Sequence, residues 1–219
     1  MPAYFSVYFE LEKTKTAIGD FYKAAIDSGL AFKRGFEGNE GNSLADVIAW
    51  NQSKLDENFQ LRLTDDFSKN FKLSWFDFSD FTEVGLGVIN NKRTSTFRFQ
   101  LIIPEDDFLD YVEENDDCIV LRKEEKMDFV KSFARSMWNR LDIVAIQTAW
   151  ECSDYPPRAK NISRNKKPQS EPFCIIKKAS VAESLGLPFE KIEKNGFFIE
   201  DRDNWLFIDF TDLSPIDFP

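Results

Sequence analysis

Alternating apolar and polar positions near the start of the chain predict a β-strand. Between residues 4 and 9, apolar side chains occupy every second position, and the residues between them also favour β-structure. Because both faces carry such residues, we expect this strand to lie in the middle of a sheet. Apolar residues then recur at helical spacing over residues 18–26 and, after Ser43 as an N-cap, over residues 44–59. A glycine-rich loop over residues 34–42 separates these two predicted helices.

The middle of the chain alternates between the strand period of two residues and the helical period. A period of two over residues 71–100, interrupted at residues 90–91, predicts an antiparallel meander. Pro104 is typical of the first turn of a helix. The acidic residues after it would complement the helix dipole, so we expect a helix to begin here. An amphipathic pattern over residues 122–141 predicts a longer helix, and the apolar run 143–146 predicts a short buried strand.

The apolar pattern disappears over residues 153–172, where four prolines accompany several basic residues. This composition predicts a long basic loop rather than a packed element. Regular structure returns as a strand over residues 173–176 and a short helix over residues 180–185. Residues 197–199 and 205–210 are expected to pair as a final hairpin.

These elements predict the α+β class, with a mainly antiparallel sheet and helices packed on it. We expect residues 1–219 to form one domain, because the strands after the basic loop are too few for an independent core. Two subdomains hinged near residues 153–172 are the alternative. The composition is compatible with a packed core, since 42% of the 219 residues are hydrophobic and 23 are Phe.

The charge balance bears on partners and location. Thirty-eight acidic against 28 basic residues give a formal charge of -10, so the average surface repels nucleic acid and attracts basic proteins. The N-terminus lacks a secretion-signal pattern, and no run of 18 apolar residues occurs. Cys118, Cys152 and Cys174 have no paired spacing and are expected to be buried, reduced thiols. We expect a cytoplasmic protein without a membrane or nucleic-acid partner.

The absence of histidine restricts the available chemistry. It removes serine and cysteine triads, imidazole bases and nearly all zinc sites, so we expect no catalytic, metal or cofactor site. Paired-carboxylate hydrolysis needs no histidine, and its candidates are Asp77 with Asp80, or Glu83; a solvated or capping role is the alternative. Gly85 and Gly87 interrupt a strand without a dinucleotide motif, which predicts a bulge or a close backbone contact.

Eight acidic residues lie between positions 105 and 117 with no Lys or Arg among them. Three interpretations are open: a solvated helix face, a docking surface for a basic protein, or a weak cation site. The predicted partner-binding residues are Asp106, Asp107, Asp110, Glu113, Glu114, Asp116 and Asp117.

Five basic residues lie between positions 158 and 167, within the basic loop. We expect a solvated, flexible loop there, with contact to a phosphate or an acidic partner as the alternative. No aromatic residues are interleaved with these charges, so single-stranded nucleic acid is a poor fit.

The order of elements carries a resemblance to a known group of proteins. Its features are an opening strand with Tyr4, Phe5, Val7 and Tyr8, two helices, an aromatic meander, a strand ending at Pro104, a helical region, the run 142–150, and Leu187-Pro188 before Gly196-Phe197-Phe198 and Trp205-Leu206-Phe207. In this layout, which spans most of the chain, the sequence resembles bacterial polymorphic-toxin immunity proteins and is similar to immunity protein family 52.

The resemblance implies a non-enzymatic protein that binds and neutralises a cognate toxin in the cell that makes it. The acidic charge fits this role, because many toxins that act on nucleic acids are basic. Aromatic anchors surrounded by charge would then dominate the interface energy. Two other classes remain open: a carboxylate-dependent hydrolase, and a structural component of an oligomer with a symmetric patch of exposed aromatic residues.

Overall fold

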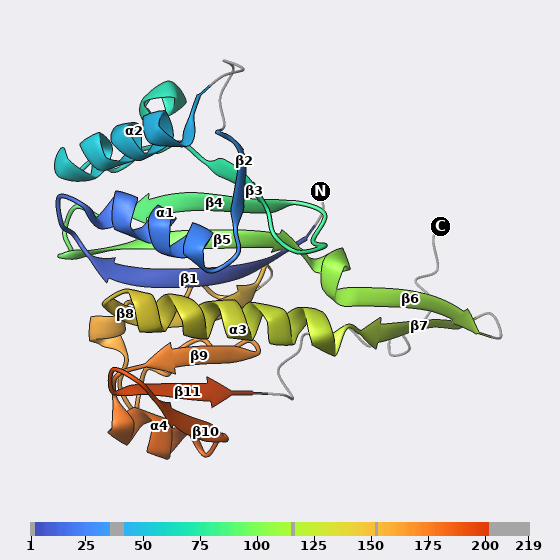
Figure 1. Ribbon diagram of the computed structural model, residues 1–219. Coiled ribbons are helices and arrows are strands. Elements are labelled where there is room, and N and C mark those ends of the chain that lie inside the picture. Colours follow the sequence, from blue (N-terminus) through green and yellow to red (C-terminus); the bar gives the residue numbers. More distant parts are fainter. Residues whose placement is uncertain (1–2, 36–41, 115–116, 152, 202–219) are drawn as a thin grey trace, which may run out of the picture.

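One large antiparallel sheet organises the chain (Figure 1). The computed structural model describes residues 3–35, 42–114, 117–151 and 153–201. Nine strands pair in the order β10-β11-β9-β8-β1-β5-β4-β3-β2, and each neighbouring pair is antiparallel. They are β1 (Tyr4–Glu12), β2 (Ala31–Gly35), β3 (Ser74–Asp77), β4 (Val84–Asn90), β5 (Thr96–Pro104), β8 (Ile143–Trp150), β9 (Phe173–Ile176), β10 (Phe189–Ile192) and β11 (Gly196–Glu200). The predicted α+β class is confirmed.

Helices cover one face of this sheet, which we call the helical face. They are α1 (Ala17–Asp27), α2 (Leu44–Asp56) and α3 (Glu124–Arg140) (Figure 1). β1 lies between β5 and β8, as predicted, and its Phe9 ring meets Phe21 of α1 at 5.3 Å and Phe133 of α3 at 6.1 Å between centroids. Phe21 also stacks on Phe99 of β5 at 3.7 Å. Burial of these large rings is the main driving force for packing the helices on the sheet.

The first turn of α2 follows the predicted N-cap. The Ser43 hydroxyl accepts a hydrogen bond from the Asp46 amide at 3.2 Å, and the Asp46 carboxylate accepts one from the Ser43 amide at 2.9 Å. This reciprocal pair satisfies two amides that a helix start leaves without partners. The sequence prediction missed β2, of which only Arg34 and Gly35 fall in the expected loop, because most of its residues are exposed and show no apolar alternation.

The last described strands differ from the predicted hairpin. β11 pairs with β10, which precedes it, across a tight turn in which Lys194 and Asn195 have φ values of 52° and 55°. Residues 205–210, the predicted partner, lie outside the described residues. The short helix α4 (Ala179–Leu185) ends at Gly186, whose φ of 69° is the left-handed conformation that glycine favours at a helix end.

The helix predicted after Pro104 is wrong. A single 3-10 turn, η2 (Glu105–Phe108), is followed by a two-stranded hairpin, β6 (Leu109–Glu114) and β7 (Asp117–Arg122), which extends away from the large sheet (Figure 1). Phe108 is fully buried, with its ring 5.0 Å from that of Phe5 and 5.9 Å from that of Trp150. The burial of Phe108 directs the chain toward the core, and this tertiary contact outweighs the local preference for a helix.

The loop predicted over residues 153–172 contains no helix or strand beyond one 3-10 turn, and part of it packs on the sheet face opposite the helical face. Residues 155–162, which we call the strap, cross this second face and include the turn η3 (Ala159–Asn161). Pro156, Ala159 and Ile162 are buried, whereas Lys160 is exposed. The two strands that flank residues 153–172, β8 and β9, are hydrogen-bonded neighbours in the sheet. The remaining 3-10 turn is η1 (Phe67–Lys69).

Two further features bear on the sequence predictions. A Cβ at Gly85 would lie 2.8 Å from the side chain of Ile102 and 3.0 Å from that of Trp75, so the close contact at this glycine is with side chains rather than with the backbone. In the described part of the chain, no helix combines the length and the hydropathy that crossing a membrane requires.

Candidate functional site

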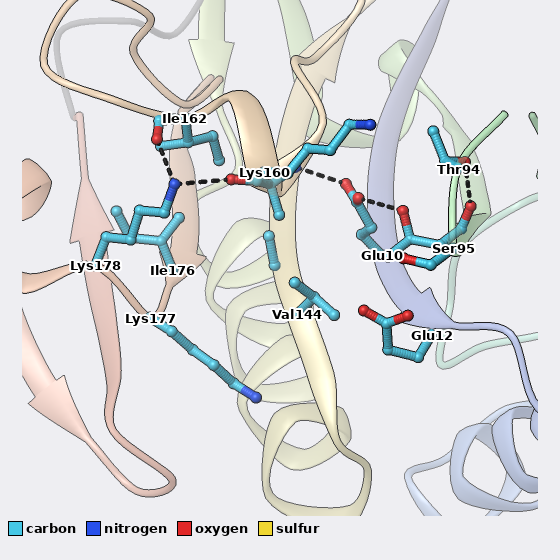
Figure 2. Close-up of a pocket in the computed structure, with 13 residues that line it drawn as sticks. Glu10, Glu12, Thr94, Ser95, Val144, Lys160, Ile162, Ile176, Lys177 and Lys178 are labelled. Carbon is cyan, nitrogen blue, oxygen red and sulfur yellow. Dashed lines mark hydrogen bonds between the residues drawn. The ribbon is translucent and has the colours of Figure 1, made fainter.

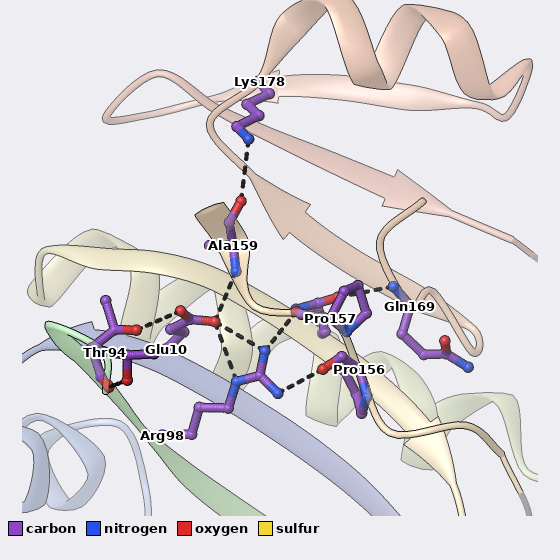
Figure 3. Close-up of polar contacts among 10 residues, drawn as sticks. Glu10, Thr94, Arg98, Pro156, Pro157, Ala159, Gln169 and Lys178 are labelled. Atoms are coloured by element: carbon purple, nitrogen blue, oxygen red, sulfur yellow. Dashed lines mark hydrogen bonds and ion pairs between the residues drawn. The ribbon is translucent and has the colours of Figure 1, made fainter. Parts of the chain in front are cut away.

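A buried ion pair lies beneath the strap (Figure 3). The register of β1 and β5 places Glu10 directly opposite Arg98, and the Arg98 Nη2 atom lies 3.0 Å from Glu10 Oε2. The Arg98 guanidinium also donates to the backbone carbonyls of Pro156 at 2.8 Å and Pro157 at 2.5 Å. A buried guanidinium needs several acceptors, and these two carbonyls of the strap supply them.

Glu10, the other member of the ion pair, also holds the strap in place. Its carboxylate accepts from the Ala159 amide at 3.0 Å and from the Thr96 hydroxyl at 2.7 Å. Gln147 of β8 donates to the Pro157 carbonyl at 2.8 Å. These contacts explain why a proline-rich, basic segment is ordered, and the strap divides the second face into two hollows.

The first hollow, which we call the tyrosine groove, has a volume of about 360 Å³. The residues that line it are Tyr4, Ser6, Tyr8, Gln100, Ile102, Ala149, Trp150, Glu151, Ser153, Asp154 and Tyr155. The Gln100 amide donates to the hydroxyls of Ser6 at 3.0 Å and Tyr8 at 3.2 Å. The Tyr155 ring stands edge-on to that of Tyr8 at 5.4 Å, yet 56% of Tyr155 is exposed. The groove therefore presents fixed polar groups and an accessible aromatic ring.

The tyrosine groove is acidic. Glu151 and Asp154 line it, and no Lys or Arg is among the described residues that do so. The Glu151 carboxylate accepts from the Tyr4 amide at 2.9 Å, which holds it at the end of the groove. Burial raises the pKa of Glu105, and repulsion from Glu151 and Asp106 acts in the same direction. The acidic region thus continues from the groove to η2, where a cation would relieve the repulsion.

The structure divides the acidic residues predicted to bind a partner. Asp106 and Asp110 are exposed, and Asp110 pairs with Lys123 at 2.9 Å. Asp107 is only 7% exposed and accepts hydrogen bonds from the amide and hydroxyl of Thr82 at 2.9 and 3.0 Å. The others that the structure describes are placed by backbone alone, Glu113 and Glu114 on β6 and Asp117 on β7. Asp116 lies outside the described residues.

Replacing Asp107 with Ala is expected to lower the free energy of unfolding by about 1–3 kcal/mol, because two hydrogen bonds to a carboxylate are lost. Urea denaturation followed by tryptophan fluorescence measures this change. The matched variant Glu83→Ala, at an exposed carboxylate, is expected to change stability by less than about 0.5 kcal/mol. Equal effects of the two variants would contradict the structural role of Asp107.

The carboxylates considered for hydrolysis are all exposed. Asp77 is exposed and lies 3.0 Å from Lys33. Lys126 lowers the pKa of Asp80 through a hydrogen bond, which is the opposite of what a general acid needs. Glu83 is exposed. No group of three or more Asp, Glu or Cys residues in the described ranges is arranged to hold a metal ion.

The predicted burial of the cysteines is confirmed for Cys174. Its side chain is fully buried, and burial raises the pKa of its thiol, which disfavours the nucleophilic thiolate. Cys118 lies on β7, and Cys152 lies outside the described residues.

Sequence reasoning missed the tyrosine groove because its walls come from distant segments. The wall residues lie within positions 4–8, 100–102 and 149–155 and meet only through strand pairing. One signal was present: the alternate face of β1, with Tyr4, Ser6 and Tyr8, is polar and aromatic rather than aliphatic. Comparisons of the chain with protein-family models and with curated proteins find no match.

Proposed function

We propose that this chain is a non-enzymatic, cytoplasmic binding protein of the immunity type, which neutralises a toxin by binding a basic surface on it. The observation that carries the proposal is the tyrosine groove, where aromatic rings and carboxylates meet without a described basic residue in the lining. The overall charge of -10 supports it, since long-range attraction would speed association with a basic partner.

The groove suits a Lys or Arg side chain of the partner. Glu151 and Asp154 supply charged acceptors for it, and the Tyr155 ring, which already has the Arg98 guanidinium at 5.4 Å, supplies an exposed aromatic surface. The exposed carboxylates of Asp106 and Asp110, beyond the end of the groove, extend the acidic surface to the rim of such an interface. Rim charges of this kind affect the association rate more than the affinity.

The direct test is binding to the product of the gene adjacent to the one encoding this chain. The two proteins are co-expressed, purified together and studied by calorimetry, and growth of cells that express the neighbour measures neutralisation. We expect a stable complex and rescue of growth. A neighbour that has no toxic effect and no affinity for this chain would overturn the immunity role.

The double variant Glu151→Gln/Asp154→Asn is expected to weaken the complex by about thirtyfold or more, as a central charged contact of about 2 kcal/mol implies. Gln keeps an acceptor for the Tyr4 amide, so the fold is retained. The matched control Asp20→Asn/Glu124→Gln removes two charges from exposed positions on α1 and α3, on the helical face. Equal losses in both variants would show that only net charge matters and that the groove is not the site.

Among the carboxylates that the structure describes, one pair favours the hydrolase alternative. Glu105 has a raised pKa and lies beside Glu151, whose amide donates to it at 3.4 Å. Replacing Glu105 with Gln would abolish a carboxylate-dependent hydrolysis, but would leave a binding function largely intact. Assay of the purified chain against glycoside and phosphoester substrates, with Glu105→Gln as the blank, distinguishes the two.

A further inference from the structure

We propose that the second hollow on this face, which we call the lysine pocket, binds a small organic anion with an apolar body. The pocket lies on the other side of the strap from the tyrosine groove and has a volume of about 210 Å³ (Figure 2). This site is independent of the proposed binding to a toxin, because it shares no lining residue with the groove.

Apolar side chains from three elements form the walls of the pocket. Val144 and Ala145 come from β8, Ile176 from β9 and Ile162 from the strap. Small residues leave the space open, since Ala145 and Ala159 lie where longer side chains would fill it. An apolar cavity of about 150 Å³ holds a benzene molecule, so a ring or a chain of about six to eight carbons fits here.

The charges around the pocket favour an anion. Three lysines line it, and the exposed Lys160 makes no ion pair with the described residues. Lys177 pairs with Asp142 at 2.7 Å, but this pair is solvent-exposed and exchanges partners at little cost. Lys178 donates to the carbonyls of Ala159 and Ile162, which fixes its charge beside the strap.

Two carboxylates also line the pocket, and they differ in what they contribute. Glu10 is neutralised by Arg98, so its charge adds little to the field in the pocket. Glu12 is exposed, and Figure 2 shows its carboxylate directed toward Val144. Three lysines against Glu12 and the paired Asp142 leave a net positive pocket on an acidic protein. An apolar body with a carboxylate therefore matches both the walls and the rim.

Octanoate is the probe for the test, with octanol and octylammonium as neutral and cationic comparisons of the same length. Binding to the full chain is measured by calorimetry and by amide chemical shifts, which also report the fold. We expect octanoate to bind about two- to fivefold more tightly than octanol, as one exposed charge contact allows, and to shift the amides of Ala145 and Ile162. Equal affinity for octanol, tighter binding of octylammonium, or no binding would each overturn the proposal.

Variants that remove a charge from the lining are expected to change the affinity for octanoate in opposite directions. Lys160→Gln and Lys177→Gln are each expected to weaken octanoate by up to about fivefold, whereas Glu12→Gln is expected to strengthen it. Val144→Phe fills the pocket and should abolish binding while the spectrum stays folded. Lys191→Gln, at an exposed lysine of β10, is the matched control and should leave the affinity unchanged. Loss of octanoate affinity in Glu12→Gln would contradict the anion assignment.

Discussion

Replacing Arg98 with Met is expected to lower the free energy of unfolding by about 3–5 kcal/mol, which is the cost of leaving a buried partner charge unpaired. Arg98 is fully buried, and its loss leaves Glu10, only 1% exposed, without its cation. The Pro156 carbonyl loses its donor at the same time, whereas the Pro157 carbonyl keeps Gln147 as a donor. Urea denaturation measures the stability, and the rate of trypsin cleavage at Lys160 reports release of the strap.

Two further variants isolate the ion pair from a general effect of substitution. Glu10→Leu/Arg98→Met removes both charges and is expected to recover part of the lost stability, because no buried charge is left unpaired. Lys23→Gln breaks the exposed Lys23–Asp27 pair and should change stability by less than about 1 kcal/mol. If Arg98→Met were as stable as the parent chain, the ion pair would not be what holds the strap.

Trp138→Ala is expected to cost about 3–5 kcal/mol, as is usual when a large buried aromatic side chain is removed. Trp138 of α3 is 1% exposed, and its indole Nε1 donates to the Glu193 carbonyl at 2.9 Å in the turn between β10 and β11. This contact joins the longest helix to the far end of the sheet. Urea denaturation gives the loss, and Phe67→Ala, at a residue of η1 that is 67% exposed, is the control with a small expected effect.

Gly196 offers a second measurement of the same contact. A Cβ at this position would lie 2.6 Å from Trp138 Nε1 and 2.8 Å from Ile192, so Gly196→Ala should cost about 1–3 kcal/mol through overpacking. Combined with Trp138→Ala, the same change should cost less, because the indole ring is gone. Strict additivity of the two changes would contradict the close contact between Gly196 and Trp138.

Local periodicity was enough to predict the elements whose buried residues follow the period of a helix or a strand. The helical spacing over residues 122–141 corresponds to α3, and β-favouring residues on both faces of residues 4–9 placed β1 inside the sheet. β10 was missed because its residues are mostly exposed and carry charge, so no alternation marks the strand. The helix predicted after Pro104 failed because burial of Phe108, a tertiary contact, determines the path of the chain.

The strap and the two hollows could not be predicted from local patterns. Arg98 and the two prolines that accept from it are 58 and 59 positions apart, and Glu10 is 149 positions from Ala159. Their proximity depends on the antiparallel pairing of β1 with β5 and β8, which sequence periodicity does not specify. The acidic residues near η2 were identified from sequence, but the burial of Asp107 was not, because its partner Thr82 lies 25 positions away.

The two outer strands of the sheet determine whether copies of the protein can associate by strand pairing. An outer strand has unpaired amides and carbonyls that can template pairing with another chain, and natural sheets limit this with short, charged edges. β2 has five residues and includes the exposed Lys33 and Arg34, whereas β10 has four and includes the exposed Glu190 and Lys191. Joining two such edges would bring charged side chains together over very few hydrogen bonds. We therefore expect these edges to resist aggregation through strand addition, even at the high concentrations that binding experiments require.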